Sequence, residues 1–205
     1  MAGLLSNFRN TMIVSLLLAG VMIYSFGVGR FDDPIFWQAL LRWVHVVAGI
    51  LWIGLLYYFN FVQIRRMPDI PAELKPAVSK YIAPEALFWF RWAALVTVLA
   101  GLATAYLRGA DYVHETLTLG LAGGFQPGDS GFTLMGTGMW LGIIMMLNVW
   151  GFIWPNQKIA LGIKDGYDAD AKAKAARTAM LFSRTNLLLS LPMLVSMTMY
   201  QTLVG

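Results

Sequence analysis

Residues 36–64 read FWQALLRWVHVVAGILWIGLLYYFNFVQI. This run is almost entirely apolar, and at about 1.5 Å per helical residue it is longer than a hydrocarbon core of roughly 30 Å requires. It predicts a membrane-spanning helix that is tilted or protrudes at one end. Arg42 and His45 lie within it, and ionisable groups inside a spanning helix usually mark a site or a partner.

The rest of the chain has the same character. Of its 205 residues, 58% are hydrophobic and only 13% are charged, and the mean hydropathy is +0.62. This composition excludes an ordinary soluble domain. Four further apolar stretches are long enough to span, at residues 11–28, 84–107, 132–154 and 179–204. The expected fold is all-α, an integral membrane bundle of about five helices forming one domain over residues 1–205, with the first helix an uncleaved anchor.

Basic residues flank these helices unevenly. With the N-terminus in the cytoplasm, ten Lys and Arg residues lie inside, and only Arg30 and Arg108 lie outside, as the positive-inside rule requires. The ten are Arg9, Arg65, Arg66, Lys75, Lys80, Lys158, Lys164, Lys172, Lys174 and Arg177. The pattern predicts a periplasmic C-terminus in a multi-pass protein of the bacterial inner membrane, in contact with lipid. The chain has a net charge of +4, but its basic residues form no continuous stripe. No nucleic-acid partner is therefore expected.

Two connecting loops are long. Residues 108–130 contain a stretch at 111–119 that predicts a short interfacial helix, followed by Gly- and Pro-rich turns. Residues 156–177 carry several Asp and Lys residues and predict a solvated, partly helical surface.

The chain has no cysteine, which excludes disulfides, thiolate metal sites, iron–sulfur ligands and c-type haem attachment. Histidine is then the best axial haem ligand available, and the two histidines are His45 and His114. A b-type haem between these two, or between His45 and an unidentified second ligand, fits this inventory, with Arg42 pairing a propionate. In the alternative, His45 bonds a neighbouring carbonyl or hydroxyl and His114 is an exposed interfacial residue. The methionines are interpreted as packing residues.

Small residues accompany His45 in the same half of the bundle. They either let a macrocycle approach the backbone or, as the Gly138-x-x-x-Gly142 spacing indicates, let helices pack closely. For each of these glycines taken alone, we favour the interpretation as a packing residue. They are Gly49, Gly101, Gly136, Gly138 and Gly142.

A second polar set lies toward the predicted cytoplasmic side. Two arginines with few carboxylates near them predict an anion pocket, and Trp89, Trp92, Trp150 and Trp154 offer aromatic faces for a planar ligand. The ligand expected there is flat and anionic. In the alternative, the arginines reach lipid headgroups or hold helices together through carbonyl bonds, and Trp37, Trp89, Trp92 and Trp154 form an interfacial belt. The predicted ligand-binding residues are Arg91, Asn148, Arg184, Asn186 and Asn60.

Four runs resemble the membrane domain of bacterial cytochrome c-linked urate oxidase, also called urate hydroxylase. They are RWVHVVAGILWIG from Arg42, continuing to Asn60, FRWAA from Phe90, NVWGFIWPNQK from Asn148 and SRTNLLLSLPM from Ser183. The resemblance covers most of the second to fifth predicted helices. Its most specific parts are WPNQK and the SRTN-x-x-L-S-x-P-M run.

The resemblance implies oxidation of urate to 5-hydroxyisourate, with electrons passed to a c-type cytochrome. Longer members of the family continue with further helices and a fused cytochrome c domain, which this sequence does not contain. Either a separate cytochrome is the expected partner, or this shortened relative no longer oxidises urate. The competing hypothesis is a non-catalytic or electron-relay subunit of a larger respiratory or oxidase complex. A membrane protoporphyrinogen oxidase fits the arginine and histidine pattern less well.

Overall fold

The computed structural model describes residues 2–122 and 130–204, and the regular secondary structure in these ranges is all helical. Five helices there are long and apolar enough to cross a membrane: Phe8–Gly27, Pro34–Asp69, Lys75–Tyr106, Ser130–Ala160 and Ala169–Leu203. Within the described residues, the prediction of an all-α fold with five helices suited to crossing a membrane is confirmed. The Gly- and Pro-rich turns predicted after residue 119 lie mainly at residues 123–129, outside the described residues.

The spans are built from consecutive helical segments, some with π-helical turns. The first is α2 (Phe8–Gly27), preceded by α1 (Ala2–Leu5), and the last is α10 (Ala169–Leu203). The second contains α3 (Pro34–Tyr57), η1 (Tyr58–Gln63), α4 (Ile64–Arg66) and η2 (Met67–Asp69). The third contains α5 (Lys75–Ala77), η3 (Val78–Ile82) and α6 (Ala83–Tyr106), and the fourth α8 (Ser130–Asn148), η4 (Val149–Ile153) and α9 (Trp154–Ala160). The short α7 (Ala110–Leu117) confirms the helix predicted in the loop after the third span.

Polar side chains fix where the spans begin. Asp33 caps α3 by accepting a hydrogen bond from the Ile35 amide at 2.9 Å, and Pro34 occupies the first turn. Asp168 caps α10 in the same way, accepting from the Ala171 amide at 2.7 Å. These caps supply acceptors for amides that have no partner within their own helix.

The second to fifth spans are each longer than predicted by about two helical turns. They contain 31 to 36 residues, so at about 1.5 Å per residue each exceeds a hydrocarbon core of roughly 30 Å. The excess lies at the end of the bundle that holds α5 and α9, here called the α9 end. The third span begins at Lys75 rather than at residue 84, and the fifth begins at Ala169 rather than at residue 179. Charged residues such as Lys80 and Lys174 are exposed there, so the helices continue after their sequence stops being apolar.

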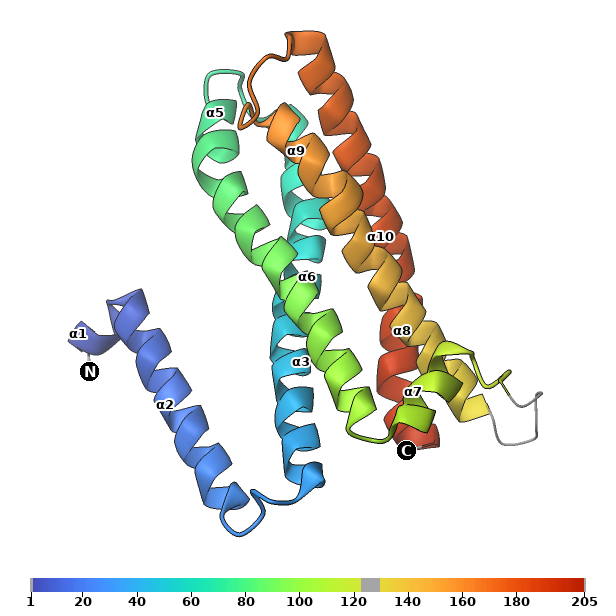
Figure 1. Cartoon of the computed structure of the whole chain (residues 1–205). Helices are drawn as coiled ribbons and strands as arrows, with labels where there is room; N and C mark the ends of the chain where they lie inside the picture. The colour runs from blue at the N-terminus through green and yellow to red at the C-terminus, as the bar shows by residue number, and fades with distance from the viewer. Residues whose placement is uncertain (1, 123–129, 205) are drawn as a thin grey trace.

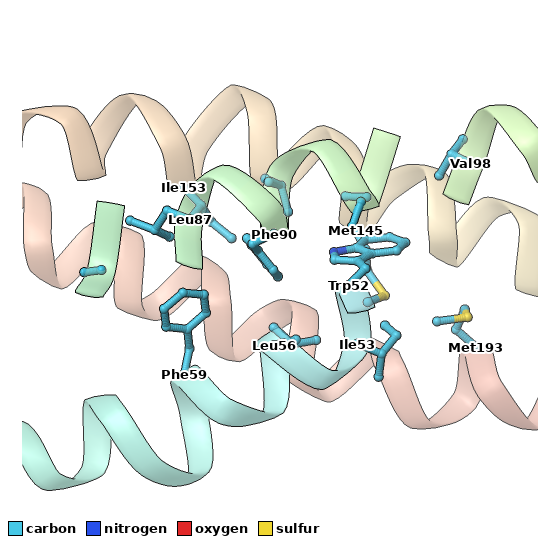
Figure 2. Close-up of a cluster of buried hydrophobic side chains, with 14 residues drawn as sticks. Trp52, Ile53, Leu56, Phe59, Leu87, Phe90, Val98, Met145, Ile153 and Met193 are labelled. Carbon is cyan, nitrogen blue, oxygen red and sulfur yellow. The ribbon is translucent and has the colours of Figure 1, made fainter. Parts of the chain in front are cut away.

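The opposite end of the bundle, here called the α7 end, holds α7, the start of α3 and the C-terminal end of α10 (Figure 1). Between the two ends, α3 packs on α6, α6 on α8, α8 on α10 and α10 on α3. The core between them contains Trp52, Leu56, Phe90 and Met145, each at most 2% exposed (Figure 2). α2 stands beside this four-helix bundle and is mostly exposed (Figure 1).

Close contact with α8 holds α7 in place. A Cβ atom at Gly136 would overlap the Thr116 carbonyl oxygen, so only glycine lets the two backbones approach this closely. The Trp140 indole N–H donates to the Leu117 carbonyl at 2.9 Å, and the Thr133 hydroxyl donates to the Leu119 carbonyl at 2.7 Å. α7 is therefore docked as a cover over this end of the bundle.

We predict that Gly136→Ala destabilises the protein, because the added methyl group forces α7 and α8 apart. The free energy of unfolding in detergent should fall by about 1–3 kcal/mol, as overpacked sites usually lose. Gly142→Ala is the matched control on the same helix, since its Cβ atom would meet nothing within 4 Å. Chemical denaturation followed by circular dichroism measures both, and equal stability of the two variants would contradict the contact.

Candidate functional site

A cavity of about 560 Å³ lies between α3, α6, α8 and α10, toward the α7 end. Its walls are mainly apolar, and Trp52 and Ile53 belong both to the lining and to the buried core shown in Figure 2. Exposed Val46 and Ile50 of α3 also line it, so one side faces the surroundings of the bundle. A cavity of this size and character suits a largely apolar ligand.

His45 of α3 is among the residues that line this cavity. Its Nδ1 atom lies 2.7 Å from the Thr97 carbonyl oxygen of α6. A carbonyl only accepts, so Nδ1 carries the proton and donates it. In the neutral ring, Nε2 then holds the free lone pair. A backbone carbonyl that fixes one ring nitrogen is the usual way in which proteins orient a metal-binding histidine.

Gly101 makes this arrangement possible. It lies one turn after Thr97 on α6, and a Cβ atom there would lie 2.8 Å from His45 Nδ1 and 2.9 Å from Cε1. Any larger residue would displace the imidazole ring from the carbonyl. The His45 position therefore depends on residues about fifty positions away in sequence.

Arginine and tyrosine side chains form the rim of the cavity. Arg42 lies one turn before His45, and Arg108 follows α6. The Arg108 Nη1 atom donates to the hydroxyls of Tyr112 at 3.2 Å and Tyr200 at 3.4 Å, and its guanidinium lies 4.6 Å from the Tyr112 ring centre. The Tyr112 hydroxyl donates to that of Tyr200 at 3.1 Å.

Neither rim arginine is neutralised by a carboxylate. Within residues 2–122 and 130–204 the one ion pair joins Arg66 to Asp69 at the α9 end. Burial, followed by the neighbouring Tyr200 hydroxyl, raises the pKa of Tyr112 above its ordinary value. Tyr112 therefore stays protonated near neutral pH. The rim is a positively charged group of hydrogen-bond donors above an apolar cavity.

His114 lies apart from His45. It is exposed on α7, and it is not among the described residues that line the cavity. Tyr112 lines the cavity, and residues two apart on a helix point to nearly opposite sides. The structure thus brings Arg42 and His45 to one cavity and leaves His114 outside it.

The five glycines singled out in the sequence divide into two groups. Gly49, Gly101 and Gly142 line the cavity. Gly136 and Gly138 serve helix packing, because Cβ atoms there would overlap Thr116 of α7 and Ser196 of α10. Of the Gly138-x-x-x-Gly142 pair, only Gly138 makes a close helix contact.

The asparagines of the second polar set are bonded within the bundle. Asn148 donates to the Asn186 side-chain oxygen at 3.0 Å, and Asn186, fully buried, donates to the Met145 carbonyl at 2.9 Å. Asn60 donates to the Leu56 carbonyl and to the Ser183 hydroxyl, each at 2.9 Å. These amides hold the second span, α8 and α10 together in the half of the bundle toward the α9 end.

The two arginines of this set occupy different surroundings. The Arg91 guanidinium lies 3.9 Å from the Trp154 ring centre, and its Nη1 atom is buried without a hydrogen-bond partner. Arg184 is exposed, while Asn186 faces the core two residues later. Trp150 donates to the Arg91 carbonyl at 3.1 Å and packs edge-on against Trp92. The predicted residues therefore do not all converge on one pocket.

Sequence reasoning missed several residues of the cavity. Thr97 carries no signal of its own, since its contribution is a backbone carbonyl. Tyr112 lines the cavity and Tyr200 bonds Arg108 at its rim, but the two tyrosines belong to segments distant in sequence. Four methionines that line the cavity, Met135, Met139, Met193 and Met197, have the spacing of ordinary packing residues.

Comparison of the chain with protein-family models, curated proteins and solved structures gives no significant match. The cavity itself is therefore the basis for an assignment.

We predict that Gly101→Ala breaks the hydrogen bond from His45 to Thr97. In a His114→Gln background His45 is the only histidine, so its ring nitrogens can be followed by ¹⁵N NMR. The bonded Nδ1–H signal should be lost in Gly101→Ala. It should persist in the control Gly49→Ala, whose Cβ atom would lie at an ordinary 3.6 Å from the Thr97 methyl group. An unchanged signal in Gly101→Ala would contradict the geometry.

Proposed function

We propose that this chain is a membrane redox protein that holds a b-type haem in the cavity between α3, α6, α8 and α10. The observation that carries the proposal is His45, whose Nδ1 is fixed on the Thr97 carbonyl, so that in the neutral ring Nε2 offers a lone pair to an iron in an apolar cavity. Arg42 and Arg108 at the rim fit the propionates of such a group, since guanidinium suits carboxylates. The residues present therefore fit a haem.

Each part of the cavity has a separate role in this proposal. His45 supplies the iron ligand, and Thr97 together with Gly101 fixes the orientation of its ring. The apolar walls exclude water, which strengthens electrostatic interactions with the nearby charges. Tyr112 and Tyr200 hold Arg108 in place. When bound, haem supplies one-electron chemistry, and the chain tunes it through the ligands and the surrounding dielectric.

We further propose an electron donor, an electron acceptor and an orientation in the membrane. The sequence resemblance supports urate as the electron donor and a c-type cytochrome as the acceptor. The excess of Lys and Arg at the α9 end supports a cytoplasmic location for this end, in a bacterial inner membrane. The cavity would then lie in the periplasmic half, near a periplasmic cytochrome. Arg91 beside Trp154 is the strongest candidate for contact with a planar anion.

A second candidate function is an electron-relay subunit of a larger complex. It is favoured by the second polar set, whose amides bond one another and whose arginines do not share a pocket. In this case the chain binds haem and carries electrons but does not oxidise urate itself.

We predict a b-type band in the dithionite-reduced minus oxidised spectrum of the detergent-purified protein after haem-replete expression. His45→Ala should lose the band while keeping its helical content, whereas the matched control His114→Ala should keep the band. Reduction by urate, with electrons passed on to an added c-type cytochrome, supports the urate oxidase assignment. Reduction by dithionite alone supports the relay subunit, and absence of the band from folded protein contradicts both.

A further inference from the structure

The cavity is lined by four thioethers as well as by His45. Met135 and Met139 come from α8, and Met193 and Met197 come from α10. Met139 and Met193 are buried in the packing, at 9% and 6% exposure, whereas Met135 and Met197 are only partly buried. Thioether sulfur is a soft ligand that binds haem iron in several proteins.

Contacts between α3 and α10 give the level of His45 along the bundle. The Tyr57 and Ser190 hydroxyls lie 3.3 Å apart, and Asn60 bonds Ser183, so the two helices are antiparallel. Counting from these two pairs toward the α7 end places His45 opposite residues 198–202 of α10. Met197 lies within about one and a half turns of this level, whereas Met193 lies deeper, beside Ile53 and Trp52.

The orientation of the imidazole ring also indicates which helix faces Nε2 of His45. Its Nδ1 is turned toward α6, where it bonds Thr97, and the two nitrogens of an imidazole point to roughly opposite sides. Nε2 is therefore turned away from α6. In the ring of four packed helices, the helix across from α6 is α10. Met197 is the partly buried methionine on that helix that lines the cavity.

We propose that Met197 is the second axial ligand of the haem, opposite His45. This inference rests on the proposed function, and it replaces His114, which lies outside the cavity. A neutral thioether favours ferrous over ferric iron, so this ligand pair gives a higher midpoint potential than two histidines would. Such a potential suits electron transfer to a c-type cytochrome.

The test compares the wild-type protein with Met197→Leu and with Met135→Leu, a matched thioether deletion on α8. Wild-type protein should show the weak red absorption of ferric haem ligated by a thioether, and its ferrous form should resist carbon monoxide. Met197→Leu should keep the Soret band through His45, lose the red absorption, bind carbon monoxide and show a lower midpoint potential. Met135→Leu should keep the red absorption and the resistance to carbon monoxide, because Met197 still binds the iron.

Three results would overturn the inference while leaving haem binding intact. The wild-type ferrous protein binds carbon monoxide readily, Met135→Leu alone shows the loss of the red absorption, or His114→Ala shows the changes expected of Met197→Leu. A folded wild-type protein without a Soret band would instead contradict the proposed function itself, and the ligand assignment with it.

Discussion

The hydrogen bond from His45 to the Thr97 carbonyl is the interaction on which the site depends. It joins the second span to the third and satisfies one nitrogen of an imidazole inside a largely apolar bundle. An unpaired polar group there would be costly. The bond forms because Gly101 leaves room for the ring, and it determines which nitrogen faces the cavity. One backbone contact thus couples helix packing to the chemistry available at the site.

Several other polar groups in the bundle are also paired, because an unpaired polar group inside an apolar bundle is costly. Polar groups on α10 face inward and find partners on neighbouring helices: Ser183 with Asn60, Asn186 with Asn148, and Ser190 with Tyr57. Near the α7 end, Tyr200 continues this face and reaches Arg108. Polar contacts thus connect the helices along most of their length. They hold the walls of the cavity while leaving its interior apolar.

Much of the fold could be predicted from the sequence, because long apolar runs have few alternatives to spanning helices. Helix ends are less predictable, since the third span, through α5 and η3, and the start of α10 extend into charged sequence. His45 stood out because ionisable residues are rare in such runs. Its partners could not be predicted, since a carbonyl at Thr97 and a missing Cβ atom at Gly101 leave no pattern near His45. Helical periodicity alone already separates Arg184 from Asn186, which face different sides of α10.

The proposed function requires Nε2 of His45 to bind the haem iron. Pulsed electron paramagnetic resonance on the ferric protein, with ¹⁵N-labelled histidine in a His114→Gln background, tests it most directly. We expect strong coupling of the iron to a single histidine nitrogen, which can come only from His45. Haem bound without any histidine coupling in this variant would contradict ligation by His45.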